Sequence, residues 1–113
     1  MPRLDFYNYD DLTLFVRIKL TDRSLLIGRS SDCHVQLPNE KVSRIHATIL
    51  VMPEERYSLK DCSANGTRVN GAIVEGETEL NPGDRIYIEN YIIIYQPKDA
   101  PVEDLTEDRT LRG

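Results

Sequence analysis

The sequence predicts a small all-β domain, organised as a sandwich or a barrel. The chain has 113 residues, which suits one domain. Apolar side chains recur at every second position in several short segments, and this is the period of a half-buried strand. Turn-forming residues separate these segments at short intervals, while no window before Lys98 has helical spacing. Many short strands with frequent turns are typical of β-sandwiches and barrels.

Apolar residues that alternate or run continuously predict six strands, and turn-forming residues predict three tight turns. The expected strands are residues 12–20, 24–29, 45–51, 57–61, 85–90 and 91–95. The third and fourth of these form a hairpin across a five-residue loop. The pairs Asn65-Gly66 and Asn70-Gly71 predict turns with positive φ. Residues 81–84, which place proline second and glycine third, predict a type II turn.

Composition limits the class of protein. The chain is 40% apolar and 29% charged, an ordinary mixture for a folded domain. Its formal net charge of -5 argues against general binding to nucleic acids or anionic membranes. Neither a membrane-spanning run nor a signal peptide is evident, so we expect a cytoplasmic protein. We expect one binding domain over residues 1–97 and a flexible acidic tail or linker over residues 98–113.

The two cysteines predict neither a disulfide framework nor a metal site. Cys33 and Cys62 lack ligand spacing, and we expect both to be reduced, partly buried small hydrophobic residues. Cys33 and His34 are adjacent on an extended segment, so their side chains should point to opposite faces and not form a nucleophile–base pair. With no acid/base pair or glycine-rich nucleotide loop, we expect no enzymatic activity and no cofactor.

Three segments at predicted strand ends carry the groups that a phosphate-binding site requires. They are Gly28-Arg29, the Ser43–His46 segment, and the Asp61–Thr67 segment. A guanidinium matches phosphate oxygens bidentately, and hydroxyl or backbone N–H donors complete such a site. Turns rich in asparagine and glycine allow the backbone to approach a ligand closely.

The order and spacing of these motifs resemble those of a forkhead-associated (FHA) domain. The pattern is G-R, then S-x-x-H, then S-x-N-G-T-x-x-N-G, and the resemblance covers about residues 25–95. It implies an eleven-stranded β-sandwich of two mostly antiparallel sheets, whose loops at one end bind phosphothreonine peptides. The implied partner is a phosphothreonine-containing protein in a Ser/Thr kinase pathway.

The resemblance also assigns roles to individual residues. Arg29 should contact the phosphate, Ser43 should donate its hydroxyl to it, and Arg44 should border the same pocket. Asn65 should hold the peptide backbone beside the phosphothreonine. Six further positions are implied as supports of the loops: Gly28, His46, Ser63, Gly66, Thr67 and Asn70. The histidine is expected to be a structural group and not a catalytic one.

One departure from the family pattern keeps a second function open. Relatives often carry a hydroxyl residue directly before the Asn-Gly pair, where this chain has Ala64; Ser63 is the nearest alternative hydroxyl. A lost hydrogen bond of this kind weakens binding by about 1 kcal/mol. The alternative is therefore a phospho-independent assembly or scaffold domain. A further alternative is a regulatory domain of a larger protein, with Thr106 or Thr110 of the tail phosphorylated and bound in cis.

Overall fold

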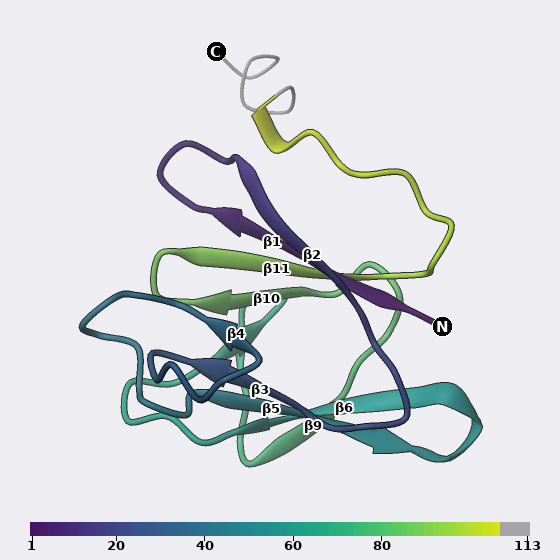
Figure 1. Ribbon diagram of the computed structural model, residues 1–113, viewed down its shortest axis with the longest axis horizontal. Coiled ribbons are helices and arrows are strands. Elements are labelled where there is room, and N and C mark those ends of the chain that lie inside the picture. The colour runs from purple at the N-terminus through teal and green to yellow at the C-terminus, as the bar shows by residue number, and fades with distance from the viewer. Residues whose placement is uncertain (107–113) are drawn as a thin grey trace.

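The computed structural model describes residues 1–106, which form two β-sheets packed face to face (Figure 1). The six-stranded sheet has the order β2 (Leu14–Lys19), β1 (Arg3–Asn8), β11 (Tyr91–Gln96), β10 (Arg85–Ile88), β7 (Arg68–Val69) and β8 (Ala72–Ile73). The five-stranded sheet has the order β4 (Val35–Gln36), β3 (Leu25–Gly28), β5 (Ala47–Met52), β6 (Arg56–Asp61) and β9 (Glu77–Glu79). The expected eleven-stranded sandwich is confirmed.

Strand pairing is antiparallel except between β3 and β4. The expected hairpin is confirmed, since β5 and β6 pair over six positions and the loop between them is a 3-10 turn, η1 (Pro53–Glu55). Two of the three predicted turns are confirmed, and at the third Gly66 has φ of 96° while Asn65 has no positive φ. Asn70 and Gly71 have φ of 53° and 93° between β7 and β8, and the Asp84 N–H donates to the Asn81 carbonyl at 2.9 Å.

Alternating side chains from both sheets make the core. Leu4, Phe6, Ile86, Ile88 and Ile93 of the six-stranded sheet meet Ile27, Ala47, Ile49 and Leu59 of the five-stranded sheet. All are fully or almost fully buried. This core holds the strand ends, and therefore the loops that leave them, in fixed positions.

Strand β1 lies between β2 and β11 in the six-stranded sheet, although the sequence pattern did not predict it. Leu4 and Phe6 face the core, while Arg3 and Asp5 alternate with them on the other face and are themselves buried. Arg3 and Asp5 hid the strand pattern in the sequence, because charged residues are rarely buried unless they are paired. Here they are paired: Arg3 Nε donates to Asp5 Oδ1 at 2.9 Å.

The described part of the expected tail lies on the outer face of the six-stranded sheet and does not stand apart from it. Leu105 is only 4% exposed and packs with Tyr7, Ile92 and Ile94. The Tyr7 hydroxyl donates to the Glu103 carbonyl at 2.7 Å, and the Glu103 carboxylate pairs with Arg85 at 2.8 Å. These contacts explain why β11 is apolar on both faces: one faces the core, and residues after the strand cover the other.

We predict that Leu105→Ala lowers the free energy of unfolding by about 2 kcal/mol, because it removes a buried side chain from this outer cluster. Val102→Ala is the matched control. Val102 is 40% exposed, so its truncation should cost less than about 0.5 kcal/mol. Urea denaturation of both variants measures the difference. Equal losses would show that the segment does not pack on the sheet as described.

Candidate functional site: a loop cluster at one end of the sandwich

The three motif segments meet at one end of the sandwich, where β3 and β6 end and β5 begins. The short segment Lys41–Ser43 is their common partner. The Arg29 N–H donates to the Ser43 carbonyl at 3.0 Å, and the Arg29 Nε donates to the Val42 carbonyl at 3.0 Å. From the other side, Asn65 Nδ2 donates to the Lys41 carbonyl at 2.9 Å. Residues far apart in sequence are thus held together by hydrogen bonds to one segment.

Arg29 is exposed, and only part of its guanidinium is used by the fold. The Nε bond to Val42 fixes the plane of the group, while its two terminal nitrogens have no hydrogen-bond partner within residues 1–106. A guanidinium held in this way keeps the planar fork that matches two phosphate oxygens.

Ser43 and Asn65 also keep unused bonding capacity. The Ser43 Oγ accepts the Ala64 N–H at 3.0 Å, which leaves the hydroxyl proton available for donation outward. Asn65 donates through Nδ2, which leaves its Oδ1 available as an acceptor. Arg44 is exposed at the same place, and its carbonyl accepts the Ser30 N–H at 3.1 Å. The cluster therefore offers the Arg29 guanidinium, one hydroxyl donor and one amide acceptor, and the exposed Arg44 follows Ser43 directly.

His46 is a structural residue of this site. It is fully buried, its Nδ1 accepts the Ser43 N–H at 3.0 Å, and its Nε2 lies 2.9 Å from the Gly66 carbonyl. Both bonds are satisfied by a neutral ring with the proton on Nε2. His46 thus ties the serine segment to the Asn-Gly turn.

Gly28 is required by a close approach of two backbones. A Cβ at this position would lie 2.3 Å from the Arg44 carbonyl oxygen and 2.9 Å from the His46 nitrogen. Any side chain would push the Ser43–His46 segment away from β3. The glycine before Arg29 therefore sets the distance between two of the three segments.

Asp61 organises the third segment, and sequence analysis did not single it out. Its Oδ1 accepts hydrogen bonds from the Ser63 N–H, the Ser63 hydroxyl and the Thr67 hydroxyl, at 3.1, 2.6 and 2.9 Å. The Ser63 Oγ in turn accepts the Gly66 N–H at 2.7 Å. An aspartate two residues before a serine is a common turn arrangement, so the spacing of these two residues was the available signal.

Asn70 is the one expected support that the structure does not bring into this cluster. Its Nδ2 donates to Asp84 Oδ1 at 2.8 Å, and its Oδ1 accepts the Arg85 N–H at 2.9 Å. It therefore joins the β7–β8 turn to the turn before β10. Of the expected tail contacts, Thr106 lies over the outer face of the six-stranded sheet beside Leu12 and Thr13, and Thr110 lies outside the described residues.

The cysteines differ from each other. Cys33 is buried, and its thiol donates to the Arg44 carbonyl at 3.2 Å, behind the loop cluster. Burial raises the pKa of this thiol, which disfavours the nucleophilic thiolate. His34 accepts the Leu26 N–H at 2.8 Å, so the two neighbours do point to different partners. The expectation for Cys62 was wrong: it is exposed, because it lies just after β6 ends.

The described residues contain no helix with the length and apolarity needed to span a membrane. Within the same residues, histidine, cysteine and carboxylate side chains form no group suited to a metal ion.

The fold and the loop cluster define a β-sandwich binding domain with an anion-compatible site on its strand-end loops. The family model of the FHA domain matches residues 25–89, which is more than half of the chain. The chain belongs to the FHA family. Its six-stranded sheet also uses β1, β2 and β11, which lie outside the matched residues.

Two curated relatives are much longer than this chain. An ABC transporter ATP-binding/permease protein of Mycobacterium tuberculosis is 34% identical over 77 residues, which are 68% of this chain and 9% of that protein. The proliferation marker protein Ki-67 of Mus musculus is 35% identical over 65 residues, which are 58% of this chain and 2% of that protein. The chain thus spans less than a tenth of either relative, and the similarity concerns one domain.

Solved structures share both fold and sequence with the chain. The FhaA FHA domain, crystallised with the intracellular domain of Rv3910, is 32% identical with a TM-score of 0.71, over 85% of this chain and all of that one. A second structure comes from a structural and functional analysis of phosphothreonine-dependent FHA domain interactions. It is 31% identical with a TM-score of 0.68, over 88% of this chain and 99% of that one.

Proposed function

We propose that this chain is a phosphothreonine-dependent protein-binding module, and that the loop cluster binds the phosphothreonine of a partner protein. The observation that carries the proposal is that Arg29 and the Ala64-Asn65 turn both bond to the segment Lys41–Ser43, which carries the Ser43 hydroxyl. The side chains of Arg29, Ser43 and Asn65 each make one hydrogen bond within residues 1–106 and keep a polar group that makes none there.

The unused groups suit the two parts of such a ligand. The Arg29 terminal nitrogens and the Ser43 hydroxyl are donors, so they match the acceptor oxygens of a phosphate. The Asn65 Oδ1 is an acceptor, so it matches a backbone N–H of the peptide. Arg44 adds a second positive charge, which lowers the free energy of a bound dianion on a protein of net charge -5.

The preference for phosphothreonine is supported by the family and by the relative described as phosphothreonine-dependent. The requirement for phosphothreonine places the module downstream of a Ser/Thr kinase. We infer a role as an adaptor or regulatory domain, since the proposed ligand is a modified side chain of another protein.

Ala64 favours moderate affinity and motivates the alternative of phospho-independent assembly. Its side chain provides no hydroxyl, and its N–H is already bonded to Ser43. The hydroxyl of Ser63 does not replace the missing group, because it donates to Asp61 at 2.6 Å. The remaining donors to a phosphate are therefore Arg29, Ser43 and Arg44.

A degenerate library of phosphothreonine peptides, with its unphosphorylated counterpart, tests this function. We expect the wild-type chain to retain only phosphorylated peptides, and Ser43→Ala to weaken the best peptide about tenfold, through loss of one hydrogen bond to a charged group. Thr21→Ala, on an exposed residue outside the cluster, is the control and should bind like wild type. Equal retention of both libraries would support the phospho-independent alternative and contradict the proposal.

A further inference from the structure

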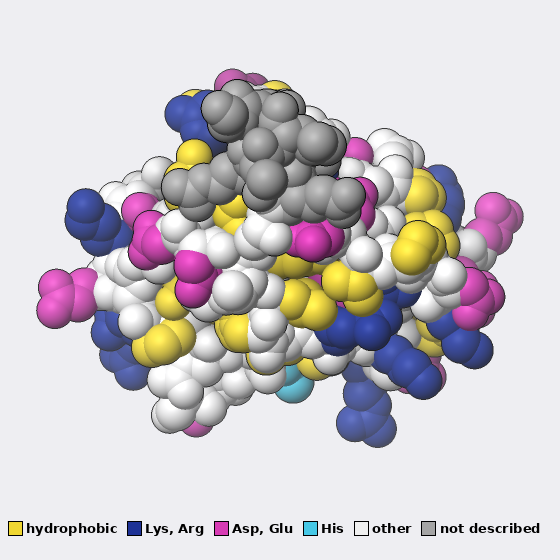
Figure 2. Space-filling view, turned by 90° about the horizontal axis from the view of Figure 1, so that it is seen from above, with side chains coloured by type: hydrophobic (Ala, Val, Ile, Leu, Met, Phe, Trp, Pro, Cys, Tyr) yellow, Lys and Arg dark blue, Asp and Glu magenta, His cyan; other side chains and the backbone are white. Residues whose placement is uncertain are grey.

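A second cationic site lies on the outer face of the six-stranded sheet, where β1 begins and β2 and β11 end. A hollow of about 290 Å³ is lined there by Arg3, Arg17, Ile18, Lys19 and Lys98. Figure 2, which looks onto this face, shows lysine and arginine side chains gathered at its lower right. In Figure 1 this end, marked by the N-terminus, lies opposite the loop cluster.

The charge at this place is opposite to that of the whole chain. Four cationic side chains line the hollow, while the chain has a formal net charge of -5. Asp5 at its base is fully buried and paired with both arginines, at 2.9 Å to Arg3 and 3.5 Å to Arg17. Neither Lys19 nor Lys98 has an ion pair within residues 1–106. The cluster therefore retains positive charge that an anionic ligand would neutralise.

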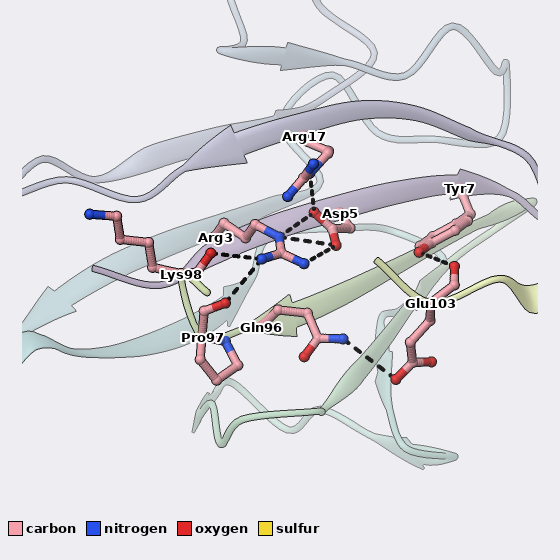
Figure 3. Close-up of polar contacts among 8 residues, drawn as sticks. All are labelled: Arg3, Asp5, Tyr7, Arg17, Gln96, Pro97, Lys98 and Glu103. Carbon is pink, nitrogen blue, oxygen red and sulfur yellow. Dashed lines mark hydrogen bonds and ion pairs between the residues drawn. The ribbon is translucent and has the colours of Figure 1, made fainter. Parts of the chain in front are cut away.

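The cations are held in place by the fold (Figure 3). Arg3 is buried, and its NH1 donates to the carbonyls of Pro97 and Lys98 at 3.1 and 2.9 Å, which fixes the backbone that carries the Lys98 side chain. Asp5 engages the Nε of Arg17, whose side chain is still 49% exposed. The terminal nitrogens of Arg17, like those of Arg29 in the loop cluster, have no partner within residues 1–106.

The same place borders an open strand edge. Strand β2 ends the order of the six-stranded sheet and pairs only with β1 among the described strands, so its other edge has unpaired backbone groups. Arg17 and Lys19 lie on the outer face of β2. Half-buried Val16 and Ile18 alternate with them and pack against the core on the opposite face. A strand added to this edge would place every second side chain beside the two cations and the intervening ones beside the apolar pair.

We propose that the β2 edge and its cationic hollow bind an extended, unphosphorylated peptide segment with acidic residues at alternate positions. The backbone of this segment pairs with β2, its carboxylates lie beside Arg17, Lys19 and Lys98, and its intervening apolar residues cover Val16 and Ile18. A peptide fits this site better than a nucleic acid, because the contacts combine a strand edge with apolar side chains. This second site would let one partner, or two, occupy both ends of the domain.

The test uses the whole chain and a fluorescein-labelled decapeptide of alternating glutamate and valine. We expect saturable binding that weakens with added salt, with amide shifts in a ¹⁵N NMR spectrum at residues 16–19 and not at Arg29, Ser43 or Ala64. Arg17→Gln/Lys19→Gln and, separately, Lys98→Gln should each weaken binding, the double variant about tenfold or more. The double variant should leave phosphopeptide binding unchanged, so that a loss of binding at this site can be distinguished from a loss of binding at the loop cluster.

Matched controls keep the proposal falsifiable. Arg23→Gln/Lys60→Gln removes two exposed cations elsewhere and should bind the decapeptide like wild type. A peptide with five glutamates followed by five valines should bind more weakly, because its charges do not alternate. The proposal would be overturned if the wild-type chain bound that block peptide or the oligonucleotide dT6 as tightly as the alternating decapeptide. It would also be overturned if the Arg17→Gln/Lys19→Gln variant bound the decapeptide like wild type, or if the decapeptide shifted only amides of the loop cluster.

Discussion

Arg29→Ala is expected to reduce the affinity for a phosphothreonine peptide by about 100-fold or more. The substitution removes the guanidinium whose terminal nitrogens have no partner among the described residues, and with it a bidentate contact to the phosphate. Each hydrogen bond to a charged group contributes about 1.5–3 kcal/mol, and about 1.4 kcal/mol corresponds to a tenfold change in affinity. Calorimetric titration of both proteins with one phosphopeptide measures the effect.

Two control variants separate the geometry of Arg29 from its charge. Arg29→Lys keeps the charge but loses the Nε bond to Val42 and the planar fork, so we expect intermediate affinity. Lys60→Ala removes an exposed cation on β6 and should bind like wild type. If Arg29→Ala and Lys60→Ala bound equally well, Arg29 would have no direct role in phosphate binding.

Gly28→Ala should lower the free energy of unfolding by about 3 kcal/mol, the upper part of the range for overpacking. The new Cβ would meet the Arg44 carbonyl oxygen at 2.3 Å, and both this atom and the His46 nitrogen belong to backbone that cannot rotate away. The segment that carries Ser43 must then move relative to Arg29, so phosphopeptide binding should weaken as well. Thermal or urea unfolding, followed by titration, measures both effects.

Gly66→Ala is the matched control for Gly28→Ala. A Cβ at Gly66 would meet nothing within 4 Å, but the residue has φ of 96°. Its cost is therefore conformational, about 1 kcal/mol, and not steric. A Gly28→Ala variant as stable as Gly66→Ala would mean that β3 and the Ser43–His46 segment are not in the close contact described.

The sequence predicted the strands whose apolar residues alternate or run continuously, and missed the strands that are very short or that contain buried charged residues. Strand β1 was hidden by Arg3 and Asp5, which are buried only because each neutralises the other. Strands β4, β7 and β8 have two residues each, too few to show a period. The docking of Leu105 depends on the second apolar face of β11, which local sequence could not show to be covered by the residues after the strand.

The residues of the site could be predicted from the sequence, but the hydrogen bonds that join them could not. Motif spacing identified Arg29, Ser43 and Asn65, yet nothing in the sequence indicates that the carbonyls of Val42 and Lys41 anchor the side chains of Arg29 and Asn65. The bridge made by His46 between the serine segment and the Asn-Gly turn depends on its buried position, which only the folded chain defines. Asn70 shows the opposite case, a motif residue that supports a distant turn.

The most direct measurement is the ¹⁵N NMR spectrum of the chain with and without one phosphothreonine peptide, compared with its unphosphorylated form. We expect the phosphorylated peptide alone to shift the amides of Arg29, Ser43, Arg44, Ala64 and Asn65 together, with one binding constant. These residues come from three segments that share the Lys41–Ser43 anchor. Shifts that are the same for both peptides, or that leave any of the three segments unchanged, would contradict it.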